Sequence, residues 1–101
     1  MRLRFAVLAR RELFRVSGRY EGEAPDLGNR FLDDAARTLS FIKDIPEARR
    51  PRPNGVRMWP MTVFPYGLLY AIEADEIVIL AVGHLRRGPR YWKSAGARSR
   101  A

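Results

Sequence analysis

The sequence contains no cysteine, and this absence removes two classes of site. Disulfide cross-links and thiolate metal centres are excluded, and the composition is compatible with a reducing compartment. The chain also lacks any apolar run near the roughly 20 residues that a membrane-spanning helix needs. The apolar run from Phe5 to Ala9 is too short for the core of a signal peptide. We therefore expect a soluble, cytoplasmic protein that makes no membrane contact.

Lysine and histidine are scarce, although the chain is strongly basic. Lys43 and Lys93 are the only lysines and His84 is the only histidine, whereas 19 basic residues face 11 acidic ones and give a net charge of +8. The excess is therefore carried by arginine, whose planar donors suit phosphates and carboxylates. This balance favours a polyanion or an acidic protein as partner. A solvated surface that reflects an arginine-rich composition is the alternative.

The spacing of apolar residues predicts a strand followed by two helices. Residues 2–8 alternate as a strand does, and helical spacing follows over residues 9–20 and again from Leu27 to Ile42. Pro25 and Asp26 are start signals for the second helix, and Pro46 ends it because proline cannot continue the hydrogen-bond ladder. The predicted apolar stripes are Ala9, Leu13, Val16 and Tyr20 in the first helix, and Leu27, Phe31, Ala35, Leu39 and Ile42 in the second.

Three strands are predicted after a proline-rich loop at residues 46–55. The first begins at Val56 and runs to Trp59, where Pro60 implies an interruption, a bulge or a sheet edge. Residues 64–73 and 76–83 are apolar on both faces, so we expect two central strands joined as an antiparallel hairpin. In the last strand, simple alternation places Ile77, Ile79 and Ala81 on one face and Val78, Leu80 and Val82 on the other.

These elements predict an α+β fold: a strand, a helical hairpin and a three-stranded antiparallel meander, with the helices packed on one side of the sheet. A length of 101 residues fits one compact domain. We expect that domain to cover residues 1–92. Residues 93–101 are expected to form a polar tail that frays.

Two segments of the last third carry a family resemblance. The strings FPYGLLY, from Phe64 to Tyr70, and IVILAVGHLRRGPRYW, from Ile77 to Trp92, resemble the C-terminal signature of RelE/ParE superfamily toxins. The likeness is to the ParE-like, plasmid-stabilisation branch, and Leu27–Phe31 resembles the opening of the family's second helix. It covers residues 2–92. The resemblance implies the toxin of a type II toxin–antitoxin system, neutralised by a cognate acidic antitoxin.

The resemblance leaves the target of the toxin open. ParE-like members inhibit DNA gyrase without RNase activity, and this is the function that we expect. RelE-like members instead enter the ribosome and cleave mRNA, which makes an mRNA endonuclease the alternative. A degenerate toxin, kept only for its pairing with an antitoxin, is a third possibility.

Cleavage of RNA would require activation of a ribose hydroxyl, stabilisation of phosphorane charge and an acid for the leaving oxygen. The residues that would serve are Arg57, His84, Arg86 and Tyr91. RelE-like sites are richer in lysine on the second strand and the preceding loop, whereas this chain has only arginine there. Arginine exchanges protons poorly near neutral pH, which argues against the nuclease.

The segment from His84 to Trp92 can instead be interpreted as a surface that recognises a target protein or a nucleic acid. Arg57 is expected to lie near it once the strands pair. Structural roles compete with this interpretation: His84 can cap the strand end, Trp92 can close the core, and the arginines of residues 49–52 can be a charged loop or a nucleic-acid anchor. The sequence has no zinc-ligand spacing, no phosphate-binding glycine loop and no nucleophile triad, so no metal or cofactor is expected. The candidate target- or nucleic-acid-binding residues are Arg57, His84, Arg86, Arg87, Arg90, Tyr91 and Trp92.

Overall fold

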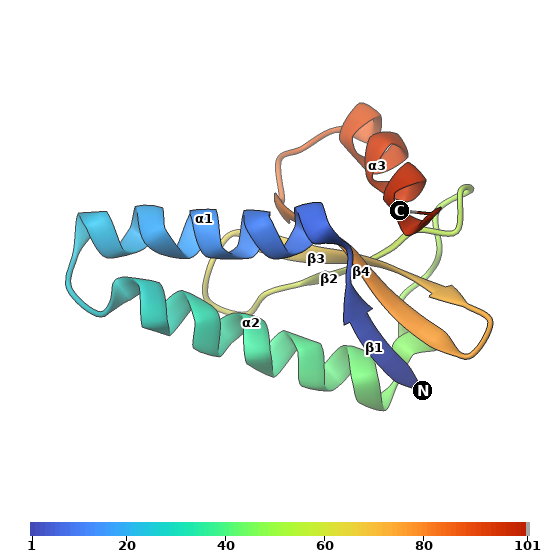
Figure 1. The fold of residues 1–101 in the computed structure, drawn as a ribbon, viewed down its shortest axis with the longest axis horizontal. Helices are drawn as coiled ribbons and strands as arrows, with labels where there is room; N and C mark the ends of the chain where they lie inside the picture. Colours follow the sequence, from blue (N-terminus) through green and yellow to red (C-terminus); the bar gives the residue numbers. More distant parts are fainter. Residues whose placement is uncertain (101) are drawn as a thin grey trace.

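The computed structural model describes residues 1–100 as a four-stranded sheet with a long helical hairpin on one face and a short helix on the other (Figure 1). The α+β fold is confirmed, and so is the predicted order of one strand, two helices and three strands. The elements are β1 (Arg2–Phe5), α1 (Val7–Glu23), α2 (Leu27–Asp44), a 3-10 turn (Pro46–Ala48), β2 (Arg57–Pro60), β3 (Tyr66–Glu73), β4 (Glu76–His84), α3 (Pro89–Gly96) and a second 3-10 turn (Ala97–Arg100).

The helical hairpin is longer than its apolar stripes predicted. α1 begins at Val7 and continues through Gly18 to Glu23. The Glu21 carboxylate then accepts hydrogen bonds of 3.0 Å from the backbone N–H groups of Asp26 and Gly28. These donors at the start of α2 have no partner within the helix, so a side chain at the end of α1 caps the beginning of α2. The cap makes a short turn between antiparallel helices possible.

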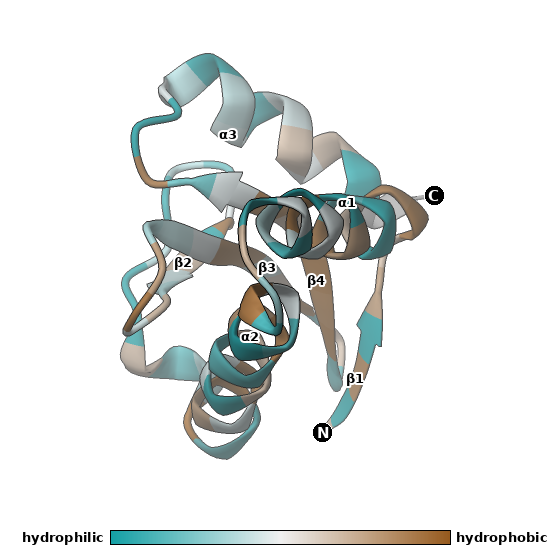
Figure 2. Ribbon diagram, turned by 90° about the vertical axis from the view of Figure 1, so that its left-hand side faces the viewer, coloured by the Kyte–Doolittle hydropathy of each residue, from teal (hydrophilic) through white to brown (hydrophobic). Residues whose placement is uncertain are grey.

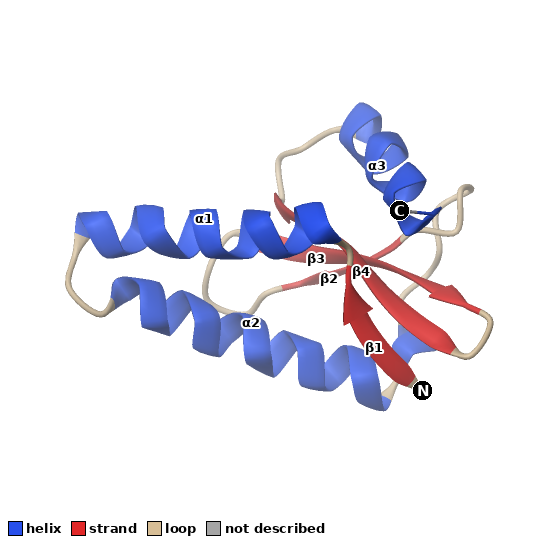
Figure 3. Cartoon of the chain, viewed as in Figure 1, coloured by secondary structure: helices blue, strands red, loops and turns tan. Residues whose placement is uncertain are grey.

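The sheet has the strand order β1-β4-β3-β2 (Figure 3). β2, β3 and β4 form the predicted antiparallel meander, and β1 joins β4 in parallel. β3 and β4 are central, as their apolar faces predicted. β2 lies at an edge, which explains how Pro60 is tolerated in a strand although it has no N–H to donate.

A β-bulge in β4 places Ala81 and Val82 on faces of the sheet opposite to those that we predicted. Tyr70 pairs with Ile79 and Leu69 pairs with Ala81, so Leu80 is an extra residue on β4. One extra residue reverses the alternation beyond it. Val82 therefore points toward the helical hairpin and Ala81 points away from it, the opposite of our prediction.

Two separate apolar cores result, one on each face of the sheet. The central strand β4 is coloured as hydrophobic in Figure 2. The larger core lies under α1 and α2, and both predicted helix stripes pack into it. The smaller core lies under α3 and contains Val56, Leu69, Val78, Leu80, Ala81 and Ala95. We did not predict α3. The apolar second face of β3 and β4 required a cover that the hairpin on the other face does not provide.

The predicted boundary at residue 92, between the domain and a polar tail, falls inside α3. Pro89, at the first turn, is compatible with a helix start because its missing N–H would have no helical partner there. The helix then continues past Lys93 to Gly96, and Ala95 is fully buried against the sheet. Position 101 lies outside the described residues.

A buried carboxylate fixes the loop that leads into β3. Asp34, on the inner face of α2, is 1% exposed. Its two oxygens accept hydrogen bonds from three successive backbone N–H groups, those of Thr62 at 3.2 Å, Val63 at 2.8 Å and Phe64 at 2.9 Å. Arg37 lies 3.4 Å from the same carboxylate. Asp34 thereby holds residues 62–64, which lead into the FPYG segment, against α2.

We predict that Asp34→Ala lowers the free energy of unfolding by about 2–4 kcal/mol, because it leaves backbone donors of the loop without an acceptor. The adjacent Asp33 is exposed and serves as the matched control. Asp33→Ala should change the stability by less than about 0.5 kcal/mol. Urea denaturation at equilibrium measures both values, and equal losses in the two variants would contradict the role assigned to Asp34.

Candidate functional site at the α3 face

The phenol ring of Tyr91 packs against Gly83 near the end of β4. A methyl group added at Gly83 would come within 2.6 Å of the Tyr91 ring. The ring can therefore pack here only because Gly83 has no side chain. Arg87 lies over the ring at 4.6 Å from its centre. Gly83, Arg87 and Tyr91 therefore form one packed unit at the start of α3.

Behind Tyr91, one carboxylate joins three parts of the chain. Glu12 of α1 is 9% exposed and accepts a hydrogen bond of 3.0 Å from the backbone N–H of Val82. Arg98 donates to the same carboxylate oxygen at 2.9 Å and to the carbonyl of Leu80 at 3.1 Å. The Tyr91 hydroxyl lies 3.5 Å from the other Glu12 oxygen. Since β1 pairs only with residues 76–79 of β4, Glu12 and Arg98 satisfy backbone groups that the short strand leaves open.

The surroundings of Tyr91 keep its hydroxyl protonated. Burial raises the pKa of Tyr91 above its ordinary value, and the Glu12 charge and hydrogen bond raise it further. The nearby Arg98 and Arg87 charges act in the opposite direction, and each is a smaller effect than burial or the Glu12 charge. A tyrosine in this state is unsuited to serve as a general base near neutral pH.

His84 occupies a structural position at the end of β4. Its Nδ1 atom accepts a hydrogen bond of 3.1 Å from the backbone N–H of Arg86, and its carbonyl accepts one of 2.9 Å from Arg87. The ring also contacts Tyr66 edge to face, with 5.2 Å between the ring centres. Tyr66 belongs to the core under the helical hairpin, so His84 and Tyr91 lie on opposite faces of β4.

Arg57 is not part of this site, although we expected it nearby. It pairs with Tyr70, whereas His84 pairs with Tyr66 at the other end of β3. Its neighbour on the same face of β2, Trp59, stacks on Phe41 of α2. The Arg57 guanidinium donates to the carbonyl oxygens of Glu47 and Arg49. It thus anchors the loop before β2 from the hairpin side of the sheet.

The arginines between the end of β4 and the first turn of α3 have no carboxylate partner among the residues with described side chains. Arg86, Arg87 and Arg90 are all exposed, and the ion pairs among residues with described side chains involve only Arg4, Arg37 and Arg98. The turn is held in shape by the His84 contacts and by Pro89. Arg86 and Arg87 on this turn, together with Arg90 in the first turn of α3, form a cationic surface that we call the arginine turn.

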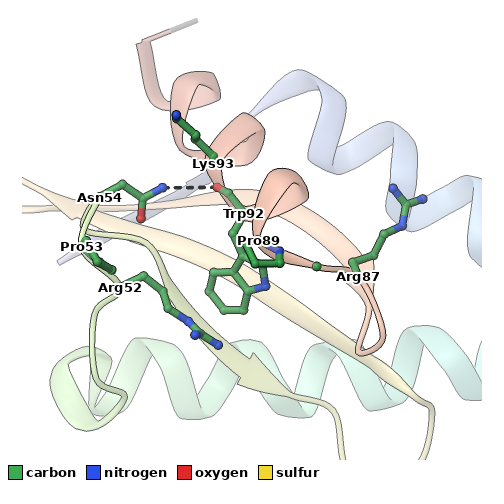
Figure 4. Close-up of a pocket in the computed structure, with 8 residues that line it drawn as sticks. Arg52, Pro53, Asn54, Arg87, Pro89, Trp92 and Lys93 are labelled. Carbon is green, nitrogen blue, oxygen red and sulfur yellow. Dashed lines mark hydrogen bonds between the residues drawn. The ribbon is translucent and has the colours of Figure 1, made fainter.

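Beside this turn, Trp92 packs against the smaller core and faces the loop before β2 (Figure 4). The Arg52 guanidinium lies over the indole at 4.2 Å from the ring centre. Asn54 donates to the Trp92 carbonyl at 3.3 Å. A pocket of about 450 Å³ opens here between the loop and α3. Figure 4 shows Arg52 directed toward Trp92 and Arg87 directed away from it.

The candidate residues from the sequence therefore separate into three places. Arg87 and Tyr91 pack together, Arg86 and Arg90 flank them, and Trp92 lies in the adjacent pocket, whereas His84 and Arg57 face the hairpin side. Sequence reasoning missed Glu12 and Arg98 altogether. Glu12 had a signal, because it falls at helical spacing among Ala9, Leu13 and Val16 and so lies on the buried face of α1.

Within the described residues, histidine, aspartate and glutamate do not gather into a group able to hold a metal ion. Among residues 1–100, none of the helices combines the length and the apolar character of a membrane span.

Comparison with protein families adds an independent finding. The family model described as "ParE toxin of type II toxin-antitoxin system, parDE" matches residues 3–89. The chain belongs to the ParE toxin family. This match includes the whole helical hairpin, β2 to β4 and all of β1 except Arg2, and it ends where α3 begins.

A solved structure supports the fold of this ParE-family protein. A chain of the chromosomal ParDE toxin–antitoxin system from P. aeruginosa superimposes with a TM-score of 0.74. The superposition covers 83% of this chain and 95% of that chain, at 19% sequence identity. A comparison with curated proteins gives no match. At this identity the structural likeness concerns the fold, and the family model carries the membership.

We predict that Gly83→Ala displaces Tyr91 and lowers the free energy of unfolding by about 1–3 kcal/mol, because the new methyl group overlaps the ring. Gly18→Ala is the control, since a methyl group there meets no neighbour in α1 and should stabilise the helix by about 0.5–1 kcal/mol. Thermal denaturation distinguishes the two signs. The loss at Gly83 should shrink in a Tyr91→Ala background, and an undiminished loss there would contradict the proposed overlap.

Proposed function

We propose that this ParE-family protein inhibits DNA gyrase through contacts made by the arginine turn that follows β4, and that a cognate acidic antitoxin neutralises it. The observation that carries the choice of target is the separation of the groups a nuclease would need. Arg57 lies on the hairpin side of the sheet and anchors a loop, while Tyr91 lies on the α3 side. His84 uses Nδ1 to cap a turn.

Proton transfer requires an acid and a base within reach of one reacting group. The two residues best able to transfer protons, His84 and Tyr91, lie on opposite faces of β4. The burial that raises the pKa of Tyr91 removes it further from the range of a useful base. Exposed arginines on a rigid turn suit recognition of another macromolecule, where arginine is often a main contributor to binding.

A separate groove supports antitoxin binding. It lies along β1 and the start of α1, where Leu3, Phe5, Val7 and Phe14 provide an apolar floor. Phe14 is 52% exposed and Val7 is 67% exposed. Arg4, Arg10 and Arg11 line the same groove.

β1 pairs with β4 on one side only, so its outer edge is open to an added strand. An apolar groove lined by arginines beside an open strand edge suits an acidic, amphipathic segment of a partner. The arginines complement its charge, and the apolar floor accepts its hydrophobic side chains.

For the gyrase activity, we predict that the free toxin inhibits supercoiling of a relaxed plasmid. Arg86→Gln/Arg90→Gln should require at least about tenfold more toxin for equal inhibition, because truncation of an interface arginine commonly costs more than 1 kcal/mol. Arg15→Gln/Arg30→Gln removes the same charge from exposed helix positions and should leave inhibition unchanged.

Undisturbed supercoiling at an excess of toxin would overturn the gyrase proposal. Primer extension on a translated message after toxin induction separates the alternatives: codon-linked cuts would favour the mRNA endonuclease. Induction without growth arrest would favour a degenerate toxin.

For neutralisation, we predict that Phe14→Asp weakens antitoxin binding by at least about tenfold and leaves gyrase inhibition intact, because it places a charge on the apolar floor. Ile45→Asp is the control, since Ile45 is equally exposed but lies at the end of α2. Titration calorimetry with the protein from the neighbouring reading frame measures the affinity. Equal loss in both variants would place the antitoxin elsewhere.

A further inference from the structure

A groove runs along the seam between the loop before β2 and α3. Three adjacent hollows form it, and consecutive hollows share lining residues. The first and second share Arg52 and Trp92, and the second and third share Asn54 and Lys93. The middle hollow has a volume of about 450 Å³ and contains Trp92, Pro53 and Pro89 (Figure 4). We call this seam the Trp92 groove.

The walls of the Trp92 groove are cationic and contain no acidic residue. Arg49, Arg50 and Arg52 line its first hollow, and Lys93 borders the other two. The sequence has no aspartate or glutamate over residues 48–72 or 77–101, which supply both walls. Among residues with described side chains, Arg50, Arg52 and Lys93 form no salt bridge. Their charges remain available to an anion.

The groove also presents an aromatic surface that is held in place. Trp92 is partly buried against the smaller core, and Asn54 donates to its carbonyl. The loop itself is fixed, because Arg52 and Val56 are joined by a backbone hydrogen bond of 2.8 Å and Asn54 Oδ1 accepts one of 3.1 Å from Val56. In the free protein the Arg52 guanidinium occupies one face of the indole, 4.2 Å from the ring centre, so a stacking base would replace it there and leave the guanidinium for a phosphate.

We infer that the Trp92 groove binds single-stranded nucleic acid, with a base against Trp92 and phosphates beside Arg50, Arg52 and Lys93. Continuous positive charge along a groove with an aromatic ring in its middle is the arrangement that holds single strands without sequence preference. An acidic peptide would match the charge but would make no use of the indole and the two prolines. A duplex presents no exposed base face to Trp92.

This inference goes beyond the proposed function and does not depend on it. The Trp92 groove borders the arginine turn at Arg87, which lines its middle hollow, but the residues tested in the two assays differ: Arg52, Trp92 and Lys93 for the groove, and Arg86 and Arg90 for gyrase. Binding of an oligonucleotide by the free toxin can therefore succeed or fail whatever the outcome of the supercoiling assay.

The experiment uses the full chain with Trp59→Phe, which leaves Trp92 as the only tryptophan. A short oligothymidylate should quench its fluorescence on binding, and a short oligouridylate tests whether RNA is held equally. Trp92→Leu should weaken binding, followed by anisotropy of a labelled oligothymidylate, by at least about fivefold, the lower end of the loss for one stacked base. Each of Arg52→Gln and Lys93→Gln should reduce the slope of log affinity against log salt by about 0.7.

Arg15→Gln is the matched control, because it removes one exposed arginine from α1 and should leave the salt slope unchanged. Lys93 is exposed, so its substitution tests the groove without disturbing the core. Binding with no change in Trp92 fluorescence, equal losses in Arg15→Gln and Lys93→Gln, or no binding at low salt would each overturn the inference. Full competition by polyglutamate together with unchanged affinity of Trp92→Leu would assign the groove to an acidic protein instead.

Discussion

The Glu12 carboxylate is the interaction on which the arrangement of this protein depends. It sits on the buried face of α1 and reaches Val82 in β4, Arg98 in the last turn and the hydroxyl of Tyr91 on α3. A buried charge is tolerated only where it has strong partners, and here the partners come from distant parts of the chain. One side chain therefore ties the helical hairpin, the sheet and α3 together. Removal of Glu12 would leave Arg98 and the backbone of Val82 without their main acceptor.

The need for Glu12 follows from the mismatch between two strands. β1 has four residues and β4 has nine, so half of the β4 edge has no strand beside it. The bulge at Leu80 falls at this point and redirects the strand. Side chains of α1 and the C-terminal segment replace the missing strand. Asp34 acts in the same way: its carboxylate accepts hydrogen bonds from three backbone N–H groups between β2 and β3, where the chain forms no strand ladder.

The sheet also separates the surfaces to which functions are assigned. The apolar groove proposed for the antitoxin lies along β1 and α1, away from the loop and α3 residues that line the Trp92 groove. The arginine turn lies at the end of β4, next to α3. The proposed antitoxin would thus meet elements that the other two partners do not contact, whereas the arginine turn and the Trp92 groove share α3 and Arg87. A substitution can remove one interaction without touching the others, provided that the Glu12 contacts stay intact.

Membership of the ParE family and the order of the elements could be read from local patterns. Helical and strand periodicities identified the hairpin and the meander, and the Phe64–Trp92 segment indicated the family. α3 was not predicted because its apolar stripe is short, although the apolar second face of β3 and β4 required another element to pack against it. The roles of Asp34 and Glu12 were not predicted, because apolar spacing does not identify polar residues, although both lie on buried helix faces. Their roles depend on backbone donors 28–30 and 70 residues away, which no local pattern contains.

The sequence by itself determined the hydrophobic layers, the central hairpin, the excess of arginine and the absence of thiol chemistry, because each depends on residue type and short-range spacing. Only the tertiary structure decided which of the candidate residues meet. One extra residue in β4 exchanged the facing of Ala81 and Val82, and the pairing of β2 with β3 carried Arg57 to the side opposite Tyr91. Strand register and bulges arise from contacts distant in the chain, so they decide the composition of a site that spacing alone leaves open.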